Sequence, residues 1–80
     1  MDTTNIIAIL IQIEEDESVP RNVKVKVRSA IEELQDQNGK SAAVKADKVM
    51  QELDELSNDP NIPMYTRTQI WNVISNLESL

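Results

Sequence analysis

Apolar residues recur at helical spacing in separate stretches of this chain, and short polar stretches with proline, glycine or asparagine lie between them. The pattern predicts four helices, at about residues 5–15, 20–37, 41–56 and 63–79. Ser41 is a typical N-cap residue, and Pro20 and Pro63 suit a first helical turn, where a missing N–H does no harm. Asn38 and Gly39 tolerate the left-handed conformation that ends helices. The fold class expected is therefore all-α.

Each predicted helix has one apolar face, and these faces together are expected to form a core. The expected core residues are Ile6, Ile9, Leu10 and Ile13, then Val23, Val27, Ala30, Ile31 and Leu34, then Ala42, Ala46, Val49, Met50, Leu53 and Leu56, and finally Ile70, Trp71, Ile74 and Leu77. The first segment is ambiguous, because its odd-numbered isoleucines from Ile7 to Ile13 also alternate as in a β-strand.

An internal repeat favours a helix for that segment. Pro20 and Pro63 lie 43 residues apart, and other pairs at this spacing are identical, namely Leu10 and Leu53, Asp16 and Asp59, Ile31 and Ile74, and Leu34 and Leu77. The first segment then corresponds to residues 49–56, whose pattern is helical. We therefore expect one domain, residues 1–80, made of two helical hairpins at about 5–37 and 41–79.

The hairpins could be arranged in two ways. Because one hairpin cannot bury its apolar face alone, the two close face to face in a compact up-and-down bundle or stack as a short superhelix. The second arrangement is suggested by Asn22-Val23-Lys24 before Val27 and Ile31, which resembles the second helix of a HEAT repeat. We favour the compact bundle, since no further repeats are present to cap an open stack.

The composition argues against catalysis. The chain has no histidine and no cysteine, which removes the usual general base, the commonest zinc ligands and disulfides. The acidic run from Glu14 to Glu17 lacks the loop spacing of a calcium site, and we interpret it as a solvated turn whose charge favours the start of the next helix. We expect no enzyme activity, no cofactor and no metal.

Charge and hydropathy indicate which binding partners and which location in the cell to expect. Its net charge of −6 argues against wholesale binding to nucleic acid or anionic lipid. The longest apolar run, from Ile6 to Ile11, is far shorter than the roughly 20 residues of a membrane span. Asp2 stands where a signal peptide carries positive charge. A cytoplasmic protein without membrane association is expected.

The aromatic residues Tyr65 and Trp71 flank Arg67 in the fourth predicted helix. On a structural interpretation, Trp71 covers the gap between the hairpins at the core edge, Arg67 lies over its ring, and Asp59 caps the helix. On a functional interpretation, Tyr65, Arg67 and Trp71 form a cluster that anchors a protein partner. Both interpretations stay open from the sequence.

A basic edge is predicted on the second helix. Arg21, Lys24 and Arg28 fall within about 60° of one another on a helical wheel, where they could hold a phosphate backbone. The alternative is local neutralisation by the preceding acidic run and by Glu32, one turn beyond Arg28. No aromatic residue interleaves these cations, so the usual signal for stacking on single-stranded nucleic acid is missing.

Short motifs carry a family resemblance. They are Val19-Pro20-Arg21-Asn22-Val23, Asn58-Asp59-Pro60-Asn61-Ile62-Pro63 and Arg67-Thr68-Gln69-Ile70-Trp71. With these motifs the chain resembles, over nearly its whole length, a family of small archaeal proteins classed as an uncharacterised protein family. The resemblance implies an all-helical fold and a cytosolic archaeal setting, and it adds no mechanism. Tyr65 stands where many members are expected to have histidine, so no role that needs an imidazole carries over.

Two hypotheses of function follow. The first is a non-enzymatic helical module that binds a protein partner or a second copy of itself. Ile7, Ile11 and Val25 do not fit a single buried stripe, so we expect a homodimer to cover them through the first hairpin. The alternative hypothesis is an RNA-associated or ribosome-associated accessory protein that uses Arg21, Lys24 and Arg28, with Arg67 as a further candidate.

Overall fold

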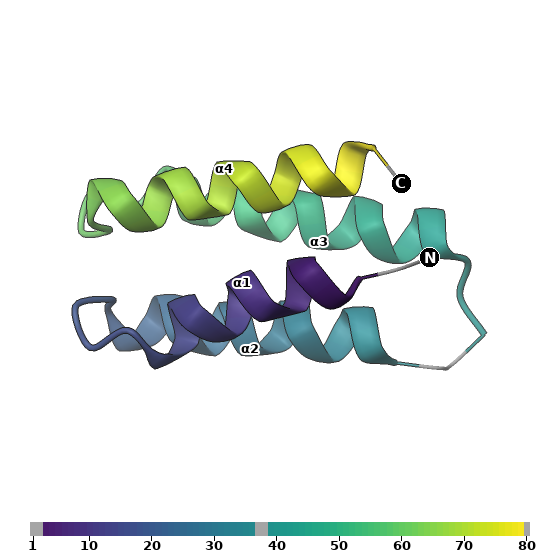
Figure 1. The fold of residues 1–80 in the computed structure, drawn as a ribbon, viewed down its shortest axis with the longest axis horizontal. Helices are drawn as coiled ribbons and strands as arrows, with labels where there is room; N and C mark the ends of the chain where they lie inside the picture. Colours follow the sequence, from purple (N-terminus) through teal and green to yellow (C-terminus); the bar gives the residue numbers. More distant parts are fainter. Residues whose placement is uncertain (1–2, 37–38, 80) are drawn as a thin grey trace.

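A computed structural model describes residues 3–36 and 39–79, and in this part of the chain every regular element is an α-helix. The helices are α1 (Thr4–Glu15), α2 (Arg21–Gln35), α3 (Ala42–Ser57) and α4 (Met64–Glu78) (Figure 1). The first segment is thus a helix and not a strand, as the repeat predicted. In the described residues, no helix is long and apolar enough to cross a membrane.

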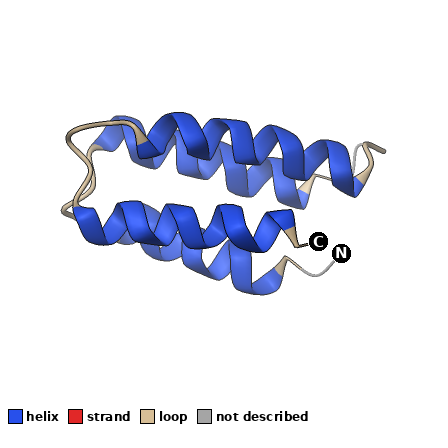
Figure 2. Ribbon diagram, turned by 90° about the horizontal axis from the view of Figure 1, so that it is seen from above, coloured by secondary structure: helices blue, strands red, loops and turns tan. Residues whose placement is uncertain are grey.

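The helices form a closed up-and-down bundle (Figures 1 and 2). Each helix packs against the next along the chain, and α1 also packs against α4. That last contact closes the ring, so the all-α compact bundle is confirmed and the short HEAT-like superhelix is excluded. Since α2 packs on α1 and α3 but not on α4, α2 and α4 occupy opposite corners of the bundle.

The buried side chains follow the 43-residue spacing seen in the sequence. Eight buried residues of the first hairpin match eight of the second, namely Ile6 and Val49, Leu10 and Leu53, Ile13 and Leu56, Val19 and Ile62, Val23 and Thr66, Val27 and Ile70, Ala30 and Val73, and Leu34 and Leu77. The hairpin loops lie at one end of the bundle, while the end of α2 and the start of α3 lie at the other (Figure 1). Residues at equivalent positions are therefore buried in both hairpins.

The helix ends differ from the sequence expectation in part. Ser41 caps α3 as predicted, its hydroxyl accepting a hydrogen bond from the Val44 N–H at 3.2 Å. Pro20 and Pro63 are the N-cap residues rather than members of the first turn, because their ψ angles of 148° and 149° are extended. α2 ends at Gln35, before Gly39, whose φ of 92° is nevertheless left-handed as expected. Asn38 lies outside the described residues.

Two expected core residues, Trp71 and Ala42, are exposed. On α4 the inward stripe consists of Thr66, Ile70, Val73 and Leu77. Trp71 follows Ile70 by one residue and is rotated by about 100° from it, away from the core. The large indole of Trp71 suggested that it is buried, but the direction of the inward stripe places it at the surface. Ile9, Met50 and Ile74 are partly buried against the core.

Thr66 is fully buried, and its hydroxyl has no hydrogen-bond partner in the described structure. Val23 occupies the equivalent position of the first hairpin and is also fully buried. We expect Thr66→Val to raise the free energy of unfolding by about 1 kcal/mol, because it removes an unsatisfied buried polar group while keeping the shape. Urea denaturation followed by circular dichroism measures this change.

Thr68→Val is the matched control, since the Thr68 side chain is exposed and its hydroxyl already donates to the Met64 carbonyl at 3.1 Å. That variant should not gain stability. A destabilised Thr66→Val variant would mean that the hydroxyl has a partner after all.

Candidate functional site

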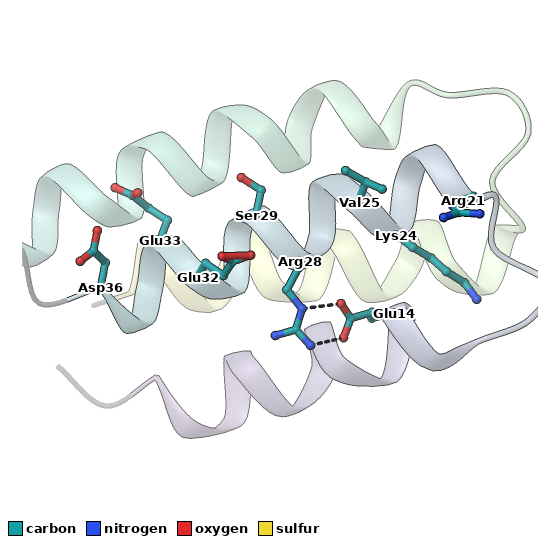
Figure 3. A pocket seen from close by; sticks show the side chains of 9 residues that line it. All are labelled: Glu14, Arg21, Lys24, Val25, Arg28, Ser29, Glu32, Glu33 and Asp36. Atoms are coloured by element: carbon teal, nitrogen blue, oxygen red, sulfur yellow. Dashed lines mark hydrogen bonds and ion pairs between the residues drawn. The ribbon is translucent and has the colours of Figure 1, made fainter.

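The outward face of α2 carries a stripe of exposed side chains with a marked order of charge. Along the helix the stripe consists of Arg21, Val25, Arg28, Ser29, Glu32 and Asp36. Lys24 and Glu33 flank it, and all eight residues line one shallow surface pocket together with Glu14 of α1 (Figure 3). The structure thus brings the predicted basic edge together on one face. It also places Glu32, Glu33 and Asp36 on the same face, and of these the sequence interpretation had named only Glu32.

Arg28 is held by an ion pair across the α1–α2 contact. Its Nε and Nη2 donate to the two carboxylate oxygens of Glu14 at 2.7 and 2.8 Å (Figure 3). The predicted neutralisation of the basic edge by the acidic run therefore occurs at Arg28. Because both oxygens of Glu14 are engaged in a bidentate pair, the Arg28 side chain has a fixed direction on the α2 face.

The remaining charges of the stripe oppose the dipole of α2. Arg21 is the first residue of the helix and Lys24 lies within its first turn, where the partial charge of the helix is positive. Neither cationic group makes an ion pair or hydrogen bond with the described residues. Glu32, in the second half of the helix, has no such partner either. Arg21 and Glu32 are therefore placed unfavourably with respect to the dipole of α2. Lys24 has a favourable interaction with Asp16 of the hairpin loop, whose pKa is lowered mainly by hydrogen bonds from Ser18 and further by this cation.

The acidic end of α2 is partly neutralised by lysines. Glu33 pairs with Lys40 at 3.2 Å and with Lys48 at 3.6 Å. The hydrogen bond from Lys40, with the charge of Lys48 adding to it, lowers the pKa of Glu33 from its ordinary value. Lys45 of α3 donates to the backbone carbonyl of Asp36. These lysines thus have their partners on or just after α2.

Arg67 binds backbone carbonyl groups at the end of α3 and in the loop between α3 and α4. Its Nε donates to the Ser57 carbonyl at 2.8 Å, and its Nη2 donates to the Asp59 carbonyl at 2.9 Å. A guanidinium at these carbonyls satisfies backbone acceptors at the negative end of α3. The expectation that Arg67 lies over the indole of Trp71 gives way to this bonding, since the loop carbonyls converge on the guanidinium.

Asp59 does not cap α4 as expected, because Pro63 occupies the N-cap position. Its Oδ1 instead accepts a hydrogen bond from the Asn61 N–H at 2.9 Å. The equivalent Asp16 does the same in the other hairpin loop, accepting from the Ser18 N–H at 2.9 Å and from its hydroxyl at 2.7 Å. These bonds from Ser18 lower the pKa of Asp16. Each loop is thus an Asx turn that orders the chain before the next helix.

The outer face of α4 carries exposed apolar and aromatic side chains. Met64 is 66% exposed, Tyr65 69% and Trp71 52%. Tyr65 and Trp71 are six residues apart and therefore differ by about 120° around the helix. With Arg67 held at the loop, the three predicted anchor residues do not form one compact cluster. Met64 and Trp71 share a face at a spacing of seven residues, and Tyr65 lies at its border.

The described residues offer little for metal chemistry. Among them, no group of three or more aspartate or glutamate side chains is placed to hold a metal ion. The acidic run is used in other ways, since Glu14 binds Arg28 and Asp16 orders its loop. The candidate functional surfaces of this chain are the outer faces of α2 and α4.

Comparison with protein families places the chain. A family model described as an uncharacterised protein family, UPF0147, matches residues 2–80. The chain belongs to UPF0147. It is 44% identical over 72 residues to the UPF0147 protein of Methanothermobacter thermautotrophicus, a match that covers 90% of this chain and 70% of that relative. It is 46% identical over 74 residues to the UPF0147 protein of Sulfurisphaera tokodaii, covering 92% and 82%.

Solved structures share the fold. The crystal structure of the unknown-function protein MMP1188 superposes with a TM-score of 0.88 at 39% identity, covering 95% of this chain and 85% of that one. A UPF0147 protein from Thermoplasma acidophilum also gives a TM-score of 0.88, at 33% identity, covering 95% and 88%. The resemblance to an archaeal uncharacterised family and the all-α fold are both confirmed.

Sequence reasoning missed part of both surfaces. Met64 was not singled out, although the i, i+7 spacing with Trp71 on a predicted helix would have shown it. The acidic end of the α2 face would have followed from a wheel that included Glu32 and Asp36. Ile7, which was expected to be left over, packs against the core, whereas Ile11 and Val25 are 37% and 62% exposed.

Proposed function

We propose that this UPF0147 chain is a non-enzymatic interaction module that binds a protein partner through the outer face of α4. The observation that carries the proposal is the position of the chain's aromatic residues: its one tryptophan and its one tyrosine are both exposed on this helix. Aromatic residues and methionine are the types enriched at interfaces, and tryptophan and tyrosine often supply most of the binding energy.

The α4 face is also low in charge. Between Met64 and Trp71 its outward side carries Thr68, and Ser75 follows one turn later, all of them exposed. The charged residues of α4 are Arg67, whose guanidinium is bound to loop carbonyls, and Glu78 at the far end. An apolar stripe with uncharged neighbours can be desolvated at low cost. The partner expected is therefore a protein with an apolar and uncharged binding surface.

Binding of RNA through Arg21, Lys24 and Arg28 receives less support. Arg28 is already paired with Glu14, and Glu32, Glu33 and Asp36 continue the same pocket. A phosphate backbone laid along α2 would meet these carboxylates after the first half of the helix, where like charges repel. A short cationic patch bounded by acids favours a partner that carries both signs of charge.

The test is affinity purification from a native lysate, with and without nuclease, followed by titration of the purified partner. We expect Met64→Ala/Trp71→Ala to keep the fold, because both side chains are at least half exposed. The double variant should lose affinity for the partner by about tenfold or more, as expected for truncated anchor residues. The partner should remain bound to the wild type after nuclease treatment.

Val44→Ala is the matched control, since it removes an apolar side chain that is 54% exposed on α3, a different helix. It should bind as the wild type does. Trp71 is the chain's one tryptophan, so the purified partner should also shift its fluorescence emission. Equal binding by the Met64→Ala/Trp71→Ala variant, or a partner released by nuclease and by Arg21→Glu, would overturn the proposal.

A further inference from the structure

We propose that a second copy of this chain docks on the outward face of α2, with the two α2 helices antiparallel about a two-fold axis near Arg28 and Ser29. The α2 face is distinct from the α4 face, so formation of this dimer does not depend on whether α4 binds a protein partner. It rests on the order of charge along α2, on the balance of that charge, and on the position of α2 in the bundle.

The stripe on α2 is complementary to itself when it is reversed. Its basic residues, Arg21 and Lys24, lie in the first half of the helix, and its acidic residues, Glu32 and Asp36, lie in the second half or just after it. In an antiparallel pair centred between Arg28 and Ser29, Arg21 faces Asp36 of the second copy. In the same register Lys24 faces Glu33, Val25 faces Glu32, and Arg28 faces Ser29.

Each contact in this register has a physical role. The ion pairs occur twice because of the two-fold axis, at the two ends of the contact. Val25, 62% exposed in the single chain, is covered by the aliphatic part of Glu32. At the centre Arg28 keeps its pair with Glu14 and meets only the small Ser29 of the second copy. The register therefore leaves the Arg28–Glu14 ion pair in place, and Glu33, which already binds Lys40 and Lys48, gains Lys24 of the second copy as a further cation.

The arrangement also removes the conflict between α2 and its own dipole. In the single chain, Arg21 and Lys24 lie at the positive end of the helix and Glu32 lies toward its negative end. An antiparallel partner brings acidic side chains and a negative helix end to the cations, and the reverse at the other end. A parallel pair would instead place cations on cations, so the charge order selects the antiparallel one.

A second copy suits this face better than another kind of molecule. The chain has a net charge of −6, so copies repel one another unless they meet at a balanced surface. On the α2 face Arg28 is paired with Glu14, and Glu33 is paired with Lys40 and Lys48. Two further cations, Arg21 and Lys24, and two further acids, Glu32 and Asp36, complete the charges that line this face. Since a two-fold interface uses the same patch twice, such a patch must be uncharged or self-complementary.

In a dimer formed through α2, the outer face of α4 stays accessible to other molecules. α2 and α4 occupy opposite corners of the bundle, so both α4 faces of the dimer point away from the shared axis. A 15-residue helix spans about 22 Å, and one such helix pair is at the small end of specific interfaces. We therefore expect a weak, reversible dimer that is sensitive to salt.

Sedimentation equilibrium on the whole chain tests the dimer. The expected result is a mass that rises from 9.1 kDa towards twice that value as concentration increases. Association should weaken between about 0.1 M and about 1 M salt, where the Debye length falls from about 10 Å to about 3 Å. A monomer mass at every concentration up to the solubility limit would overturn the proposal.

Charge reversal tests the face and its orientation. Arg21→Glu and Asp36→Lys, which reverse the two residues that face each other, should each lose self-association by about tenfold or more, and an equal mixture of the two variants should form a heterodimer. The chain that carries both reversals restores this ion pair with its direction exchanged and keeps the net charge of −6. It should self-associate as the wild type does. If it stays monomeric, or if either single reversal leaves association unchanged, the register is wrong.

A single cysteine tests the axis, because the natural chain has none. Ser29→Cys places a thiol beside the two-fold axis, whereas Ser75→Cys places one on the exposed side of α4. Mild oxidation should cross-link Ser29→Cys at concentrations at which Ser75→Cys remains monomeric. Faster cross-linking of Ser75→Cys would place the contact on α4 and refute the α2 dimer. Circular dichroism of every variant checks that these exposed substitutions leave the helices intact.

Discussion

Leu53→Ala should lower the free energy of unfolding by about 3 to 5 kcal/mol, the range for leucines whose removal leaves a cavity that cannot collapse. Leu53 is fully buried, and it lies within α3, which packs against both α2 and α4. Single domains of about this size have only a small margin of stability, so the variant is expected to be largely unfolded at room temperature. Urea denaturation followed by circular dichroism measures the loss.

The equivalent residue of the first hairpin gives an internal comparison. Leu10 is also fully buried, so Leu10→Ala should cost about as much as Leu53→Ala. Val44→Ala, which truncates an exposed residue of the same helix as Leu53, should change the stability by about 0.5 kcal/mol or less. A Leu53→Ala variant that melts with the wild type would show that the closed bundle described here is wrong.

Arg67→Ala should lower the free energy of unfolding by about 2 to 3 kcal/mol, less than either leucine truncation. It removes two hydrogen bonds from a charged donor and leaves the Ser57 and Asp59 carbonyls without them. It also removes the cation from the negative end of α3. Thermal and urea denaturation should both show the loss, and the substitution should leave binding at the α4 face intact in whatever fraction remains folded.

Two control variants separate this bonding from charge alone. Arg67→Lys keeps the charge but cannot make both bonds from a planar fork, so it should recover only part of the stability. Lys24→Ala, at the equivalent position of the first hairpin, removes a cation that makes no hydrogen bond to its loop in the described structure and should have little effect. If Arg67→Ala is as stable as Lys24→Ala, the guanidinium does not hold the loop.

The comparison of the two hairpins shows which structural features could be predicted from the sequence. The helices of the second half could be assigned from their spacing, and the repeat carried that assignment to the first segment, where periodicity alone was ambiguous. Ser41 and Gly39 behaved as their chemistry predicts. The errors fell on Trp71, Arg67 and Asp59, whose surroundings depend on how α3, α4 and their loop come together.

Those errors have a common physical cause. A helical wheel gives the angle between side chains but not which angle faces the core, and a large indole was taken as evidence for burial. The core of α4 instead follows Thr66 and Val73, a stripe that leaves Trp71 at the surface. Hydrogen bonds such as those of Arg67 to loop carbonyls join residues ten and eight positions apart. Spacing within one helix cannot predict them.

By itself the sequence determined the number of helices, their order and most of their inward faces, because these depend on local spacing, capping and the repeat. Only the tertiary structure decided that α1 closes against α4, that Glu14 of α1 pairs with Arg28 of α2, and that Trp71 stays exposed. These features depend on which surfaces meet across the bundle, and that is set by packing between helices rather than by the pattern within any one of them.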